Sequence, residues 1–214
     1  LNVSINKENI IFVSAAVVVC NIVIFCRDGR RKKEKNKMQK IGLVIAIEEE
    51  FKVFLKKLGG AKNVKAGAYD VCECRAGDKI VYAVKTGAGE LCAAAATQFL
   101  ITAFGAELIV NAGVCGNLSK NLKILDTVVV KEVVHYQYDI SAVDNCAVGK
   151  YEQFESVNIP SDEFFREKVL SSFDFIKEAR CASGDKFIAE KDITLTAQCE
   201  ANTDTEYKVE YYQQ

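Results

Sequence analysis

Apolar and polar positions along the chain form strand-length runs that alternate with helical patterns. Residues 40–47 (KIGLVIAI) and 107–113 (ELIVNAG) are continuously apolar, which is typical of central strands covered on both faces. Residues 68–75 and 79–85 flank Ala76-Gly77-Asp78 and predict a hairpin. Two further β-rich stretches are residues 125–139 and 180–188.

Helical patterns lie between these runs. We expect helices from Glu48 through Leu58, over the small-residue stretch 90–104, and over residues 161–179 with Ser161 as the N-cap. Since strands and helices alternate, the predicted class is α/β, with a mixed central β-sheet flanked by helices.

The loops after the predicted strands are candidates for one converging site, because ligands of open α/β sheets bind beyond the carboxyl ends of the strands. Gly87-Ala88-Gly89 lacks the third glycine of a dinucleotide fingerprint and is equally explained as a tight turn before a helix. The acids Glu48-Glu49-Glu50 would interact favourably with the macrodipole at the start of the following helix, and one of the three could instead activate water. The other two loops are residues 113–116 and 183–188.

Composition excludes several function classes. The net charge of −1 gives no overall attraction to nucleic acid. A single histidine, His135, excludes schemes that need two, and we expect it to be structural. The nine cysteines form no CxxC pair, so we expect reduced thiols, no metal site and no cofactor.

The N-terminal segment has its own pattern. Residues 10–26 are almost continuously apolar, and residues 27–37 carry a net charge of +5. This order predicts a membrane anchor that leaves the following domain in the cytosol. Alternatively, Met38 is the natural start and residues 1–37 are upstream sequence. Contact with a membrane is expected only if residues 10–26 are a real anchor.

Six motifs occur in the order and approximate spacing of one family: MQKIGLVIAIEEEF, KTGAGELCAAAA, VNAGVCGNL, LDTVVV, YDISAVD and SGDKFI. From residue 38 to about 190 the chain resembles the 5′-methylthioadenosine/S-adenosylhomocysteine nucleosidases, in the nucleoside phosphorylase/uridine phosphorylase superfamily. The resemblance implies a three-layer nucleoside phosphorylase-like fold. It also implies hydrolysis of the adenine–ribose N-glycosidic bond, a role in nucleoside catabolism and methionine salvage, adenine nucleosides as small-molecule partners, and a homodimer in the cytoplasm.

The resemblance also implies roles for individual residues. Glu50 matches the family's water-activating glutamate. Gly116 matches a loop glycine that lets the backbone approach the ribose and base. Phe187 matches the aromatic residue that stacks on adenine, and Ile188 the position whose backbone binds the purine edge. Pocket-lining positions are matched by Ala46, Ile47, Ala88 and Ile140, whereas Val143 stands where the family often has phenylalanine.

A phosphorylase of the same superfamily is the rival interpretation. It would need an arginine for phosphate after the first strand, where this chain has Glu48-Glu49-Glu50. The charge of these residues favours hydrolysis.

The family continues after SGDKFI with a Met-Glu element that binds the ribose hydroxyls and a Ser-Asp element whose aspartate protonates adenine. No Ser-Asp follows residue 190, so we expect residues 191–214 to be a divergent tail after the nucleosidase-like domain, residues 38–190. An inactive, truncated nucleoside-binding domain is therefore a further alternative.

Overall fold

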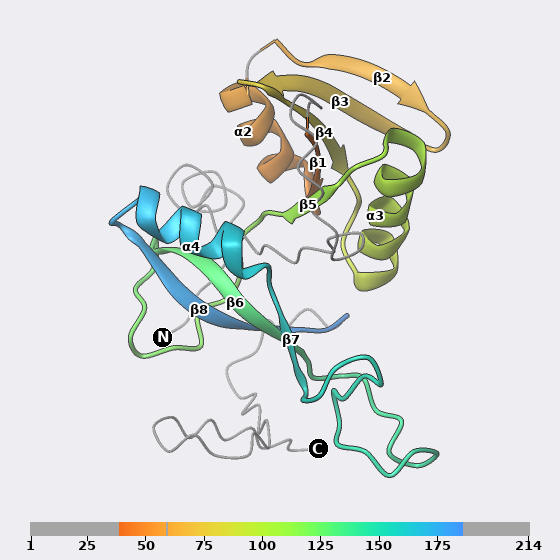
Figure 1. Ribbon diagram of the computed structural model, residues 1–214, viewed down its shortest axis with the longest axis vertical. Coiled ribbons are helices and arrows are strands. Elements are labelled where there is room, and N and C mark those ends of the chain that lie inside the picture. Colours follow the sequence, from red (N-terminus) through yellow and green to blue (C-terminus); the bar gives the residue numbers. More distant parts are fainter. Residues whose placement is uncertain (1–38, 59, 186–214) are drawn as a thin grey trace.

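A five-stranded mixed sheet forms the larger part of the molecule (Figure 1). The computed structural model describes residues 39–58 and 60–185. β1 pairs in parallel with β4 on one side and with β5 on the other, while β2, β3 and β4 are antiparallel neighbours. The order across the sheet is β2 (Lys62–Ala66), β3 (Tyr69–Ala76), β4 (Lys79–Lys85), β1 (Lys40–Ile45) and β5 (Leu108–Asn111).

Both faces of this sheet are covered by helices, which explains why β1 is apolar after Lys40. Leu43 and Ile45 of β1 pack on one face with Phe51 of α2 (Glu48–Leu58). Val44 packs on the opposite face with Leu100 of α3 (Glu90–Phe104). Figure 1 shows α2 and α3 on opposite sides of the sheet. The predicted α/β class, with a mixed sheet flanked by helices, is confirmed.

A second sheet of three strands carries the rest of the described chain. β6 (Thr127–His135) lies between β7 (Asn158–Pro160), to which it is antiparallel, and β8 (Ile176–Ser183), to which it is parallel. α4 (Glu163–Ser172) packs against β6 and β8. The buried residues of β6 are Val128, Val129, Val130 and Val133. The strands are therefore divided between two sheets, a division that the sequence did not indicate.

The predicted helix over residues 161–179 is wrong at both ends. Asp162, not Ser161, is the N-cap of α4, because its Oδ1 accepts the N–H of Phe165 at 2.8 Å. Ser161 instead donates its hydroxyl to the Val130 carbonyl at 2.6 Å and so holds the start of α4 against β6. The helix ends at Ser172, and pairing with β6 draws Ile176–Ser183 into β8.

Several of the sequence predictions fall outside the described part of the chain. Among them are the apolar segment 10–26, the basic residues 27–37 and the tail 191–214. Within residues 39–58 and 60–185, no helix combines the length and the apolarity that crossing a membrane requires.

Candidate active site

A cleft of about 180 Å³ lies at the carboxyl ends of the parallel strands β4, β1 and β5. Past the strand ends, the N–H of Gly87 still donates to the Ala46 carbonyl at 3.1 Å, which keeps the glycine-bearing loop beside the end of β1. The end of β8 forms the opposite rim. The residues that line the cleft are Ala46, Thr86, Gly87, Gly89, Glu90, Ala93, Asn111, Ser183 and Gly184.

The structure separates the three glutamates that open α2. Glu48 is exposed and pairs with Lys85 at 2.6 Å, which lowers its pKa through the hydrogen bond to that ammonium. Glu50 is buried, with 6% of its surface exposed, and its Oε1 accepts the N–H of Val114 at 2.8 Å. Glu49 is exposed, so the three residues have different surroundings, and it is Glu50 that contacts the loop after β5.

Gly113 permits this approach of Glu50 to the loop after β5. A Cβ at position 113 would lie 3.1 Å from each carboxylate oxygen of Glu50. That distance is shorter than ordinary van der Waals contact, so a side chain there would displace the carboxylate.

Burial raises the pKa of Glu50, and the backbone hydrogen bonds from Val114 and Ile47 oppose that rise. Its Oε2 accepts no hydrogen bond from any residue in the described ranges. Glu50 is thus a desolvated carboxylate with one oxygen oriented by the backbone and the other available. Such a group is suited to take a proton from a bound water.

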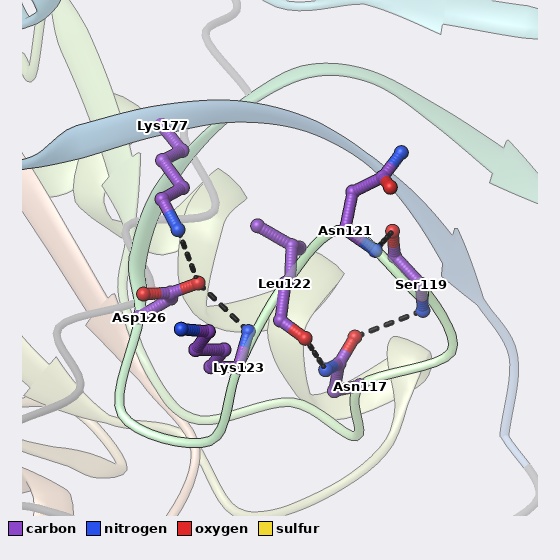
Figure 2. A network of polar contacts seen from close by, with 7 residues as sticks. All are labelled: Asn117, Ser119, Asn121, Leu122, Lys123, Asp126 and Lys177. Atoms are coloured by element: carbon purple, nitrogen blue, oxygen red, sulfur yellow. Dashed lines mark hydrogen bonds and ion pairs between the residues drawn. The ribbon is translucent and has the colours of Figure 1, made fainter.

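The loop that carries Val114 continues into a polar network that fastens its far end (Figure 2). Asn117 donates to the Leu122 carbonyl at 2.7 Å and accepts the N–H of Ser119 at 2.8 Å. Asp126 accepts the N–H of Lys123 at 2.8 Å and pairs with Lys177 of β8 at 2.6 Å. These contacts fix the loop to the second sheet.

Leu125, beside Asp126 in this loop, has a φ of 79°, the left-handed region that a branched side chain rarely adopts. Its side chain is half exposed, so little packing compensates the strain. We expect Leu125→Gly to raise the free energy of unfolding by about 0.5–1 kcal/mol, measured by urea denaturation. A lower stability in the variant would contradict the strained conformation.

Some of the residues predicted for the site lie at the cleft, and others lie away from it or outside the described residues. Ala46 lines the cleft, while Ala88 is exposed between Gly87 and Gly89, which both line it. Gly116 is exposed in the loop after β5, and Val143 is 87% exposed. Ile47 precedes α2, and the Ile140 carbonyl accepts the N–H groups of Val143 and Asp144. Phe187 and Ile188 lie outside the described residues, and the binding roles of all these positions stay predictions.

Sequence reasoning missed a second polar cluster at the cleft. Glu90, which opens α3, pairs with Nε2 of His135 at 2.8 Å and accepts the hydroxyl of Ser183 at 3.0 Å. Nδ1 of His135 lies 2.6 Å from the hydroxyl of Tyr151. No spacing rule connects residues this far apart in the sequence, and the only available signal was an acid in the first turn of a helix.

In the part of the chain that the structure describes, no three His, Cys, Asp or Glu side chains converge to hold a metal ion.

The three-layer α/β fold, with a cleft and a buried glutamate at the strand carboxyl ends, defines a nucleoside phosphorylase-like protein. The sequence pattern of the phosphorylase superfamily matches residues 40–210, and the chain belongs to this superfamily.

Two similar proteins of known name are 5′-methylthioadenosine/S-adenosylhomocysteine nucleosidases. The chain is 28% identical over 159 residues to the 5′-methylthioadenosine/S-adenosylhomocysteine nucleosidase of Shewanella denitrificans, covering 72% of this chain and 69% of that one. It is 32% identical over 103 residues to the nucleosidase of the same name from Exiguobacterium, covering 48% and 44% of the two chains. The chain thus spans less than half of this second relative.

Solved structures of a nucleosidase of this name and of a futalosine hydrolase have folds similar to that of this chain. The Helicobacter pylori nucleosidase of this name superposes with a TM-score of 0.65 at 26% identity, covering 72% of this chain and 67% of that one. A mutant of the futalosine hydrolase of H. pylori superposes with a TM-score of 0.64 at 28% identity, covering 72% and 71%.

Proposed function

We propose that the chain carries the catalytic cleft of a nucleosidase that hydrolyses the N-glycosidic bond of 5′-methylthioadenosine and S-adenosylhomocysteine and releases adenine. The names of the similar proteins support this substrate class. The observation that carries the proposal is the buried carboxylate of Glu50, with Oε1 held by Val114 and Oε2 without a partner among the described residues.

The reaction follows from this geometry. A water bound at Oε2 would donate a proton to Glu50 as its oxygen attacks C1′ of the ribose. The electron pair of the glycosidic bond leaves with adenine, which takes up a proton from solvent to become the neutral base. Positive charge develops on the ribose ring in the transition state. A carboxylate already desolvated and oriented by the backbone stabilises that charge without reorganising.

Charge around the cleft favours water over phosphate as the nucleophile. Glu90 lines the cleft. The buried carboxylate of Glu50 lies against Gly113, two residues after the cleft-lining Asn111. Lys85, at the end of β4, is already paired with Glu48. No lysine or arginine is among the described residues that line the cleft. A phosphate dianion would therefore meet carboxylates without a cation to neutralise it.

The homodimer and the cytoplasmic location implied by the family resemblance belong to the proposal. So does the assignment of the nucleoside-binding positions, including Gly116, Phe187 and Ile188.

The reaction class is tested by following adenine release from 5′-methylthioadenosine with and without phosphate. We expect the same rate of release in both conditions, with free 5-methylthioribose as the second product, because water is the nucleophile. A phosphate requirement, with 5-methylthioribose 1-phosphate as product, would show a phosphorylase. Mass spectrometry of the sugar product separates the two results.

A further inference from the structure

The first turn of α3 and the end of β8 are joined by two reciprocal hydrogen bonds across the mouth of the cleft. The Glu90 carboxylate accepts the hydroxyl of Ser183, and the Glu90 backbone N–H donates to Oδ1 of Asp185 at 2.5 Å. The N-cap of α3 is Gly89, which has no side-chain cap bond of its own. Asp185, which follows the last strand of the second sheet, therefore accepts a hydrogen bond from an N–H of the first turn of α3, as a capping side chain would.

The two sides of this link lie on opposite rims of the same cleft. Gly87, Gly89 and Glu90 line it from the α3 side. Ser183 and Gly184 line it from the β8 side. The link thus fixes the separation of two walls that belong to different sheets.

A second set of groups holds the Glu90 carboxylate in place. Because a carboxylate only accepts hydrogen bonds, Nε2 of His135 must carry the proton in the 2.8 Å contact with Glu90. In the neutral ring, Nδ1 then accepts the hydroxyl of Tyr151. Burial, together with the charge of Glu90, raises the pKa of Tyr151 and so keeps that hydroxyl protonated. Tyr138 stacks on Tyr151 with ring centroids 4.1 Å apart and an interplanar angle of 6°, which limits movement of the ring.

We propose that Glu90 is a positioning residue for nucleoside binding: its carboxylate, held between Ser183 and His135, fixes α3 against the end of β8 and sets the width of the cleft. This inference rests on the proposed function for the identity of the ligand. The link itself is independent of the reaction. Since both carboxylate oxygens are engaged, Glu90 holds the walls and Glu50 remains the group available to the reacting water.

The effect of Glu90 is tested in the full chain with 5′-methylthioadenosine as the probe. We expect Glu90→Ala to raise KM about 10–100-fold, because two hydrogen bonds to a charged group are lost, while kcat falls less than about threefold. Glu90→Gln should recover most of the lost affinity, since its amide oxygen can accept from His135 and its NH₂ can donate to the Ser183 hydroxyl. An unchanged KM in Glu90→Ala, or a fall in kcat alone, would overturn the positioning role.

Two further variants separate positioning from loss of folding. Ser183→Ala removes one hydrogen bond and should raise KM about threefold to tenfold in a folded protein. Glu163→Ala is the matched control, because Glu163 also opens a helix but is exposed and does not line the cleft. A rise in KM in Glu163→Ala equal to that in Glu90→Ala would show a general effect of helix-terminal charge and overturn the proposal.

A measurement without turnover distinguishes failure of this inference from failure of the proposed function. Cys92 is half-buried in the first turn of α3, and its Sγ lies 3.8 Å from where a Cβ on Gly87 would stand. We expect alkylation of Cys92 by iodoacetamide, followed by peptide mass spectrometry, to be severalfold faster in Glu90→Ala than in wild type or Glu163→Ala. Equal rates would refute the link. If the wild type releases no adenine while Cys92 is still alkylated faster in Glu90→Ala than in the wild type, only the proposed function is refuted.

Discussion

Glu50→Gln is expected to lower the turnover of 5′-methylthioadenosine by about 10²–10⁴-fold, the usual contribution of a general base. The substitution keeps the shape of the side chain and an oxygen to accept the Val114 N–H, so the fold should be unchanged. Glu48→Gln is the matched control, because Glu48 occupies the same helical turn but is exposed and paired with Lys85. We expect its turnover within about threefold of wild type. Retained turnover in Glu50→Gln would remove Glu50 from the mechanism.

Titration of the Glu50 carboxyl group should link the pH dependence of activity to the pH dependence of stability. Burial raises the pKa of Glu50 in the folded chain above its unfolded value, so the ionised form is penalised by folding. The stability contributed by Glu50 is present below the unfolded pKa and is lost as the pH rises through the folded pKa. Activity changes in the opposite direction, because only the ionised carboxylate accepts a proton. Above the raised pKa, Glu50→Gln should therefore be at least as stable as wild type in thermal melts, and a markedly lower melting temperature would contradict this.

Leu100→Ala should cause the largest loss of stability, about 2–5 kcal/mol, because Leu100 is fully buried between α3 and the sheet. For a chain of this size, that loss lowers the melting temperature by about 5–15 °C. Leu91→Ala in the same helix is the control, since Leu91 is 81% exposed and should change the melting temperature by less than 2 °C, roughly the limit for a surface site. Equal losses in the two variants would show that α3 does not pack as described.

The sequence predicted those elements whose patterns are local. β1 was recognisable because both of its faces are apolar, and α3 because a small-residue stretch follows Gly87-Ala88-Gly89. The structure ends α3 at Gly105, which adopts the left-handed conformation. The N-cap of α4 was misplaced because Ser161 and Asp162 are both good caps, and only contact with β6 selects between them. β2 and β7 were missed, since short polar strands have no strong pattern.

The candidate site was likewise predictable only where neighbouring residues in the sequence carry the pattern. Glu48-Glu49-Glu50 could be proposed as a group because acids follow the carboxyl end of a strand, but only the family resemblance singled out Glu50. In the structure, burial separates Glu50 from Glu48. The link among Glu90, His135 and Ser183 could not be predicted, because 93 residues separate Glu90 from Ser183 and only the packing of two sheets brings them together.

The division of strands between the two sheets has a consequence for how the chain acquires its structure. Every strand of the five-stranded sheet precedes every strand of the three-stranded sheet in the sequence. During synthesis, β1 to β5 with α2 and α3 can therefore complete a core on both faces before β6 emerges from the ribosome. The cleft gains its second wall only when β8, the last strand described, docks. Assembly of the binding site is thus a late step that follows formation of most of the apolar core.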